Sequence, residues 1–155
     1  MSTSEDNTFS VETPEESSGF LLWQVTNLWQ REIKKALEQY NITHSQFVLM
    51  ASIHWLTIHK QEVTQIVLSA NTKIDPMTTS TVLRTLQQKN FIAREEHATD
   101  TRAKVVVLTD LGKEIIKKAI VTVEDFDRKF FSVSGVKTND LNQNLIALLG
   151  QKLVE

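Results

Sequence analysis

The sequence predicts a mainly α-helical fold of the α+β class, in which a β-hairpin directly follows a short helix. Residues 75–90 combine a helix start signal with an amphipathic pattern. The two segments that follow, 91–96 and 103–108, are rich in β-prone residues, and a short charged tip at 97–102 separates them. Helical spacing of apolar residues then resumes on both sides of this unit.

The first helix is expected within residues 13–40. Thr13-Pro14-Glu15-Glu16 combines a hydroxyl cap, proline at the first helical position and glutamate three residues after the cap. Apolar residues then recur at three and four positions from Phe20 to Tyr40. Asn41 is a suitable left-handed terminator for this helix.

The next two helices are expected at 44–57 and 65–72. Thr43 and Gln46 form a capping box for the first of them, and its apolar residues cover most of its sides, so it should be central and buried. Glu62-Val63 is a candidate strand of one or two residues, and Thr64 caps the shorter helix.

Asp75 caps the helix that precedes the hairpin, Pro76 occupies its first position, and Asn90 can end it. After the hairpin, Thr109 caps a helix over 110–131. Gly135 breaks the pattern, and a last helix opens at Thr138. A helix followed at once by a basic hairpin is the outline of a winged helix-turn-helix, which places one helix in a DNA groove.

Composition excludes several classes of protein. The 155 residues suffice for one domain, and 41% are hydrophobic, so a packed core is expected. The absence of cysteine excludes disulfides and thiolate metal sites. No apolar run approaches the roughly 18 residues of a membrane span. The polar, acidic residues 1–12 are expected to form a flexible N-terminal tail and do not resemble a signal peptide, which favours a cytoplasmic protein.

Charge is distributed unevenly along the chain. The net charge is −2, but residues 1–20 hold five acids and no base, so the remainder carries 17 basic and 14 acidic residues, a net of +3. Residues 60–104 hold seven bases and five acids. This mild bias is compatible with a nucleic-acid surface and equally with an ordinary solvated surface.

Motifs for catalysis or metal binding are missing from the sequence. It has no glycine-rich phosphate loop, no H-E-x-x-H and no nucleophile motif, so an enzyme is not expected. The four histidines do not have the spacing of metal ligands, and we expect neither a metal nor a cofactor.

The helices at both chain ends carry more large apolar groups than a monomer would bury. Residues 43–108 make a compact winged helix-turn-helix lobe, which leaves 13–40 and 110–155 outside it. Exposed apolar surface of this kind favours a symmetric partner chain. We therefore expect residues 13–155 to form a single domain that dimerises through these terminal helices, although a monomer whose terminal helices wrap the lobe is the alternative.

The ordered series of motifs resembles the MarR family of bacterial transcription regulators, from about Phe20 to the end of the chain. Its most specific parts are DPMTTST, LQQKNFIAR, the wing sequence Asp100-Thr101-Arg102, and Leu108-Thr109 followed by Gly112. The resemblance implies a triangular homodimer and a repressor that binds an inverted-repeat operator in double-stranded DNA. It further implies release of DNA when a small aromatic or anionic effector binds the cleft between the lobes.

Two residues depart from the family pattern. Lys73 stands where many relatives have glycine in the turn before the recognition helix, and Asn90 replaces the usual glycine after it. The segment 75–88 holds one arginine and no lysine. This sparse charge favours base contacts by hydroxyl and methyl groups. It also motivates an alternative function, a winged-helix protein-interaction module with little or no DNA binding.

Seven residues are candidates for DNA contacts: Thr78, Ser80, Thr81, Arg84, Arg94, Arg102 and Lys104. Arg102 at the wing tip suits a narrow minor groove, although it could instead fold back onto Asp100. Arg84 suits a guanine edge, whereas Thr and Ser hydroxyls discriminate weakly. Thr78 could serve only as a helix cap, and Arg94 suits either a phosphate or an ion pair. Four residues are candidates for an effector site: Trp29, Phe47, Met50 and His54.

Overall fold

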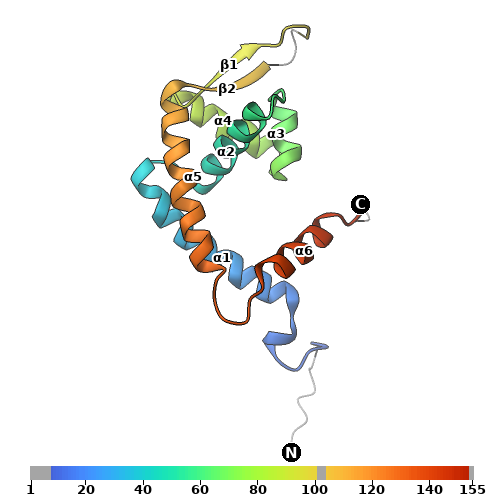
Figure 1. Ribbon diagram of the computed structural model, residues 1–155. Helices are drawn as coiled ribbons and strands as arrows, with labels where there is room; N and C mark the ends of the chain where they lie inside the picture. The colour runs from blue at the N-terminus through green and yellow to red at the C-terminus, as the bar shows by residue number, and fades with distance from the viewer. Residues whose placement is uncertain (1–7, 101–103, 154–155) are drawn as a thin grey trace, which may run out of the picture.

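The computed structural model describes residues 8–100 and 104–153, and it confirms a mainly helical fold with a two-stranded wing. An upper lobe holds α2, α3, α4 and the hairpin, and α5 runs from this lobe down beside α1 (Figure 1). In chain order the elements are η1 (Pro14–Glu16), α1 (Ser18–Leu37), η2 (Glu38–Tyr40), α2 (His44–Ile58), α3 (Gln65–Thr72), α4 (Pro76–Gln88), β1 (Ile92–Glu96), β2 (Lys104–Leu108), α5 (Asp110–Phe130) and α6 (Thr138–Leu149).

The N-terminal start signal at Thr13 was expected to open the first helix, and this detail is wrong. The Glu16 carboxylate accepts the Thr13 amide N–H at 2.9 Å, but the motif closes only the 3₁₀ turn η1. Ser17 then adopts an extended backbone, and its hydroxyl accepts the Phe20 amide N–H at 3.4 Å. A second capping residue therefore starts α1 afresh.

Left-handed residues end the helices where the sequence places them. Asn41 and Asn90 have φ of 54° and 64°, as expected for asparagine at such positions. Lys73 ends α3 with φ of 63°. The turn between α3 and α4 therefore keeps the left-handed backbone although a residue with a Cβ replaces glycine.

The wing is an antiparallel hairpin whose register pairs Ile92 with Leu108 and Glu96 with Lys104. A third, very short strand joins it. We expected that strand at Glu62-Val63, and the structure places the bridge at Thr64, opposite Val105. The Val63 carbonyl accepts the Val106 amide N–H at 2.8 Å. The segment before α3 thus anchors the wing to the lobe.

The base of the wing is fastened to α5 by the motif Leu108-Thr109 with Gly112. The Thr109 hydroxyl donates to the Asn90 carbonyl at 2.7 Å and accepts the Gly112 amide N–H at 3.0 Å. A Cβ on Gly112 would lie 2.0 Å from the Phe91 carbonyl oxygen. Only glycine therefore allows α5 to approach the end of α4 this closely.

Helix α2 is central, as its apolar sides predicted, and Leu49, Met50 and Ile53 on it are fully buried. The core extends from α2 to the C-terminal half of α1, to α3, α4, both strands and α5. Helix α6 has no buried residue and lies away from the lobe (Figure 1). Within the described residues no helix is long and apolar enough to span a membrane.

Candidate nucleic-acid interface

The turn between α3 and α4 is held by hydrogen bonds that meet at one carbonyl group. The Ile74 carbonyl accepts the Ser69 hydroxyl at 2.6 Å and the Thr79 hydroxyl at 3.3 Å. Thr79 is fully buried and also donates to the Asp75 carbonyl at 2.9 Å. Because these bonds link the end of α3 to the first turn of α4, the two helices form one rigid helix-turn-helix unit.

Asp75 caps α4 through both carboxylate oxygens. Oδ1 accepts the Thr78 amide N–H at 2.8 Å, and Oδ2 accepts the Thr78 hydroxyl at 2.7 Å. These hydrogen bonds, first from the Thr78 side chain and then from its backbone, lower the pKa of Asp75. The hydroxyl proton of Thr78 is therefore committed to the cap, and only its lone pairs face outward. The capping role considered for Thr78 is present in the structure.

The outward face of α4 is a stripe formed by Met77, Thr81, Arg84 and Gln88. The opposite face packs into the lobe through Thr79, Leu83 and Leu86, which are fully buried. The Thr81 hydroxyl donates to the Met77 carbonyl at 3.1 Å, so it faces solvent as an acceptor. Ser80 is half-buried, at the edge of the stripe.

Met77 is 81% exposed but is not among the contact residues predicted from the sequence. Its spacing from Thr81 and Arg84, at i, i+4 and i+7, is the signal that could have identified it. An exposed thioether at the start of a helix offers an apolar contact of the kind that thymine methyl groups receive.

The wing tip is braced by His97. Its Nδ1 lies 3.1 Å from the Thr99 amide nitrogen and 3.0 Å from that of Asp100, so Nδ1 must be an acceptor. Nε2 then carries the hydrogen and donates to Glu62 Oε1 at 2.6 Å. One neutral imidazole therefore ties the tip to the segment before α3. Glu62 and His97 are 35 residues apart, and no local pattern predicts their contact.

Arg94 and Lys104 lie on the same face of the wing, because Arg94 pairs with Val106 and Lys104 with Glu96. Lys104 is exposed. Arg94 is half-buried, and its Nε is buried without a hydrogen-bond partner among the described residues. Arg102, the third candidate on the wing, lies outside the described residues.

The four candidates for the effector site divide between a cavity and the core. Phe47 and His54 line a cavity of about 380 Å³ between α2, the end of α3 and α5. Met50 is fully buried in the core and does not reach the cavity. The Trp29 indole N–H donates to Asp127 Oδ1 at 2.8 Å, and Asp127 lines the cavity.

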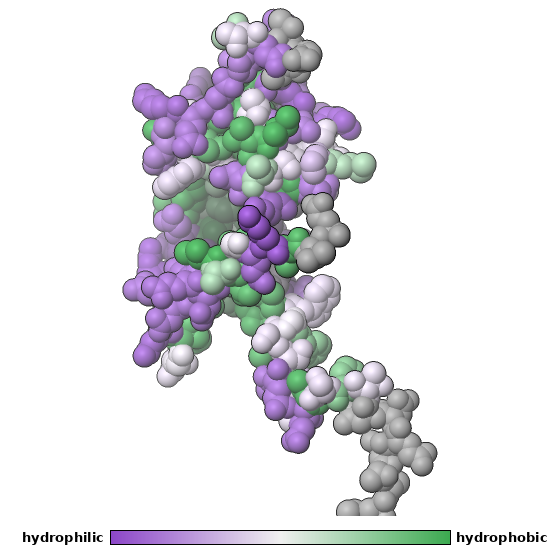
Figure 2. Space-filling model, turned by 90° about the vertical axis from the view of Figure 1, so that its right-hand side faces the viewer, coloured by the Kyte–Doolittle hydropathy of each residue, from purple (hydrophilic) through white to green (hydrophobic). Residues whose placement is uncertain are grey.

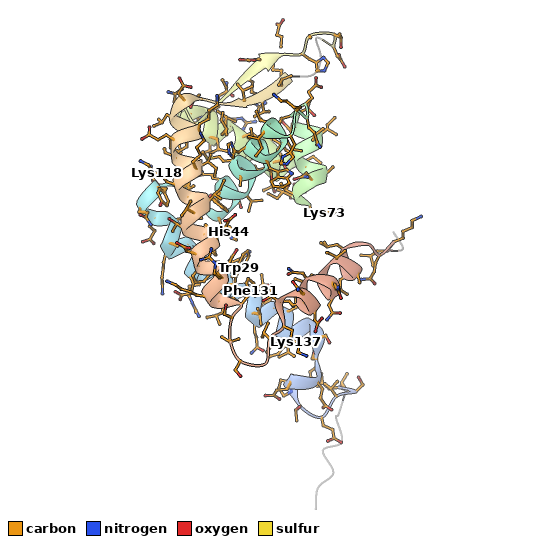
Figure 3. The ribbon with its side chains drawn as sticks, viewed as in Figure 1. Trp29, His44, Lys73, Lys118, Phe131 and Lys137 are labelled. Atoms are coloured by element: carbon orange, nitrogen blue, oxygen red, sulfur yellow. The ribbon has the colours of Figure 1, made fainter. Side chains whose placement is uncertain are left out.

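Trp29 also contacts His44, with ring centroids 4.8 Å apart, where α1, α2 and α5 meet (Figure 3). Burial lowers the pKa of His44, and the negative charge of Asp127 opposes that change. Trp29 and His44 therefore support the cavity from behind without lining it.

Comparison with known proteins identifies this arrangement. Residues 38–127 match the family of the ArnR1-like winged-helix domain. The HTH-type transcriptional regulator YdcH of Bacillus subtilis strain 168 is 40% identical over 129 residues, which cover 83% of this chain and 88% of YdcH.

Two solved structures share the fold at lower identity. A mutant MarR from E. coli, complexed with operator DNA, has a TM-score of 0.71 and 21% identity, covering 84% of this chain and 90% of its own. BpsR of Bordetella bronchiseptica, whose DNA binding is regulated by 6-hydroxynicotinic acid, has a TM-score of 0.78 and 18% identity, covering 89% and 96%.

Proposed function

This chain belongs to the winged-helix transcriptional regulators of the HTH type and has the fold of MarR, and we propose that it represses genes by binding an inverted-repeat operator as a homodimer. It is a regulator and not an enzyme. Its place of action would be the cytoplasm, where bacterial DNA is accessible. The observation that carries the proposal is the outward stripe of α4 beside the wing, on a rigid helix-turn-helix unit.

The chemistry of the stripe fits the major groove. Arg84 offers two parallel N–H donors to a guanine edge, Thr81 offers an acceptor, and Met77 offers an apolar surface. Lys104 on the wing would lie near the backbone phosphates, and Arg102 would enter the adjacent minor groove. Ser80 and Thr78 would make weaker phosphate contacts. The half-buried Arg94 fits a bracing role with partial access to a phosphate.

Exposed apolar residues on α1 and α6 support the homodimer. Phe20, Leu22 and Trp23 on α1 are exposed by 46%, 55% and 67%, and Ile146 and Leu149 on α6 by 66% and 67%. A monomer would leave this surface in water, whereas a second copy would bury it. Two copies related by two-fold symmetry would hold two α4 helices at the spacing of operator half-sites.

The cavity between α2 and α5 supports control by a small ligand. It lies between the lobe that carries α4 and the long helix α5, which leads to the proposed dimer region. An effector that binds one orientation of the lobe more tightly than another would favour that orientation. The change in DNA affinity would then be limited by the difference in effector affinity between the two orientations. BpsR provides a precedent among proteins of this fold, since 6-hydroxynicotinic acid regulates its DNA binding.

The primary test is selection of bound duplexes from a random pool by the full chain, with the mass of the complex measured by light scattering. An inverted repeat bound by two chains is expected. A protein-interaction module would instead enrich no sequence. In a salt titration it would also lack the steep loss of affinity that follows when several phosphate contacts release counterions.

Two variants separate base contacts from phosphate contacts. Arg84→Ala should alter the selected motif, because a bidentate guanine contact contributes about 1–3 kcal/mol of discrimination. Arg102→Ala should weaken binding to all duplexes and make the salt slope shallower by about 1. The same motif for Arg84→Ala and parent would contradict the role of Arg84, and unchanged affinity of Arg102→Ala would remove the wing tip from the interface.

A further inference from the structure

The walls of the cavity between α2 and α5 define the chemistry of a ligand more closely than the family resemblance does. Phe47, His54 and Trp55 come from α2, Asn71 comes from the end of α3, and Glu124 and Asp127 come from α5. At about 380 Å³ the cavity suits a ligand of one or two rings. Figure 2 shows hydrophobic groups gathered in the hollow between the upper lobe and the lower helices.

Negative charge dominates the lining. Glu124 and Asp127 are one turn apart on α5, and no lysine or arginine lines the cavity within the described part of the chain. The nearby bases on α5 have partners elsewhere, since Arg128 pairs with Asp125 at 2.8 Å and Lys118 with Glu114 at 3.4 Å. Lys73, two residues beyond Asn71, does not line the cavity (Figure 3). The negative charges of Glu124 and Asp127 would therefore repel a bound anion.

Aromatic side chains from α2 line the same cavity as these carboxylates. Trp55 is 59% exposed, and His59 covers one side of its ring with the ring centroids 4.1 Å apart, so the other side is the one it offers to a bound molecule. Phe47 is buried and also lines the cavity. Indole is the best of the side chains at attracting a cation through its π-system, and the attraction increases when the cation loses water. The Trp29 N–H bond fixes one carboxylate oxygen of Asp127, and the second oxygen remains available to a ligand.

We infer that this cavity binds a small aromatic cation, a protonated or quaternary amine carried on a ring, with the ring against Phe47 and Trp55 and the charge at Glu124 and Asp127. The inference rests on the proposed function, because it names the effector class of the same cleft. It keeps the aromatic ring of the expected effector and replaces the expected negative charge with a positive one.

A second cavity has basic residues in its lining and is the alternative site for an anion. It measures about 490 Å³ and includes Lys34, His44 and Lys89 in its lining. Lys89 already donates to the Asn41 carbonyl at 2.8 Å and to Gln46 Oε1 at 3.0 Å. Its ammonium is therefore engaged in joining α4 to the start of α2, which leaves it less able to bind an anion.

The test uses three ligands that differ mainly in charge: benzylamine, benzyl alcohol and benzoate. Calorimetric titration of the full chain at neutral pH should show benzylamine binding about tenfold more tightly than benzyl alcohol, with benzoate weakest. The double variant Glu124→Gln, Asp127→Asn should reduce the preference for benzylamine to less than about threefold. Glutamine and asparagine keep the shape of the wall and remove both charges.

The matched control is Asp110→Asn, which removes one exposed carboxylate from the same helix but outside the cavity. It should retain the full preference for benzylamine. Tightest binding by benzoate, an equal loss in the Asp110→Asn control, or no binding by any of the three up to about 10 mM would each overturn the inference. Duplex selection is performed without ligand, so its outcome tests the proposed function separately.

Discussion

Gly112 illustrates how one residue fixes the junction of two elements. Its amide N–H donates to the Thr109 hydroxyl, which caps α5, and its missing Cβ leaves room for the Phe91 carbonyl. The sequence identified this glycine through a family motif. The structure supplies the physical reason, because backbone atoms at 2.0 Å from a Cβ cannot coexist with any side chain.

Gly112→Ala should lower the free energy of unfolding by about 1–3 kcal/mol, because α5 must move away from the wing base. The matched control is Gly19→Ala, since a Cβ there meets nothing within 4 Å. That control should leave stability unchanged or raise it by less than about 1 kcal/mol. Denaturant unfolding followed by circular dichroism measures both, and equal stability of Gly112→Ala and parent would contradict the clash.

His44 gives the folded state a pH dependence whose sign is defined. Burial lowers its pKa below the ordinary 6.5, so the unfolded chain binds the proton at a higher pH than the folded chain does. The contribution of neutral His44 to stability is therefore complete above pH 6.5 and is lost as the pH falls below it.

His44→Gln should flatten the stability profile between about pH 7 and pH 5, because glutamine does not titrate there. His59→Gln serves as the control, since His59 is exposed at the end of α2. Denaturant midpoints measured across this range provide the profile. A slope in His44→Gln as steep as in the parent would show that other groups are responsible.

At the scale of elements, the wing depends on a brace that joins distant parts of the chain. The acceptance of the Thr99 amide by His97 Nδ1 resembles an Asx-turn, in which a side-chain acceptor binds the amide two residues ahead. The second ring nitrogen adds the bond to Glu62. The tip therefore has both a local and a long-range support.

His97→Ala should remove both supports and weaken operator binding several-fold, since each hydrogen bond contributes about 0.5–1.5 kcal/mol. His97→Asn should restore part of this affinity, because asparagine can accept the Thr99 amide but cannot reach Glu62 as well. Gel-shift titration measures the affinities, with unchanged circular dichroism as the check on folding. Equal affinities for alanine, asparagine and parent would show that the brace does not position the wing.

The observed helix starts show which capping signals in the sequence predict a boundary correctly. The caps at Thr43, Thr64, Asp75 and Thr109 all open helices as expected, because each hydroxyl or carboxylate satisfies an amide within three residues. The prediction that Thr13 caps the first long helix was wrong because Ser17 offers a second cap four residues later. A short-range signal does not determine which of two caps the long helix uses.

At the scale of the whole molecule, α6 and the N-terminal half of α1 carry the apolar surface that the proposed homodimer would bury. Helix α6 has no buried residue, and the first buried residue of α1 is Ile33. Both segments present large apolar groups to solvent. Burial of such groups contributes roughly 25 cal/mol per Å², so an obligate interface would supply much of the stability of these helices.

The double variant Ile146→Glu, Leu149→Glu should reduce the light-scattering mass towards that of one subunit and abolish tight operator binding. A suitable control is Ile66→Glu, because Ile66 on α3 is 81% exposed but lies in the lobe. The control should keep the dimer mass. A parent chain of single-subunit mass at micromolar concentration would contradict the homodimer, and an unaffected double variant would exclude α6 from the interface.

The sequence by itself determined the order of the helices and strands, the left-handed positions at Asn41 and Asn90, and the choice of Thr81 and Arg84 on the outward face of α4. Caps, turns and helical spacing depend on residues within one or two helical turns of each other, so they can be predicted without knowledge of the tertiary structure. The tertiary structure alone decided which side chains meet across the chain. Trp29 and Asp127 are 98 residues apart, and the cavity and its negative wall exist only because packing brings α2, α3 and α5 together.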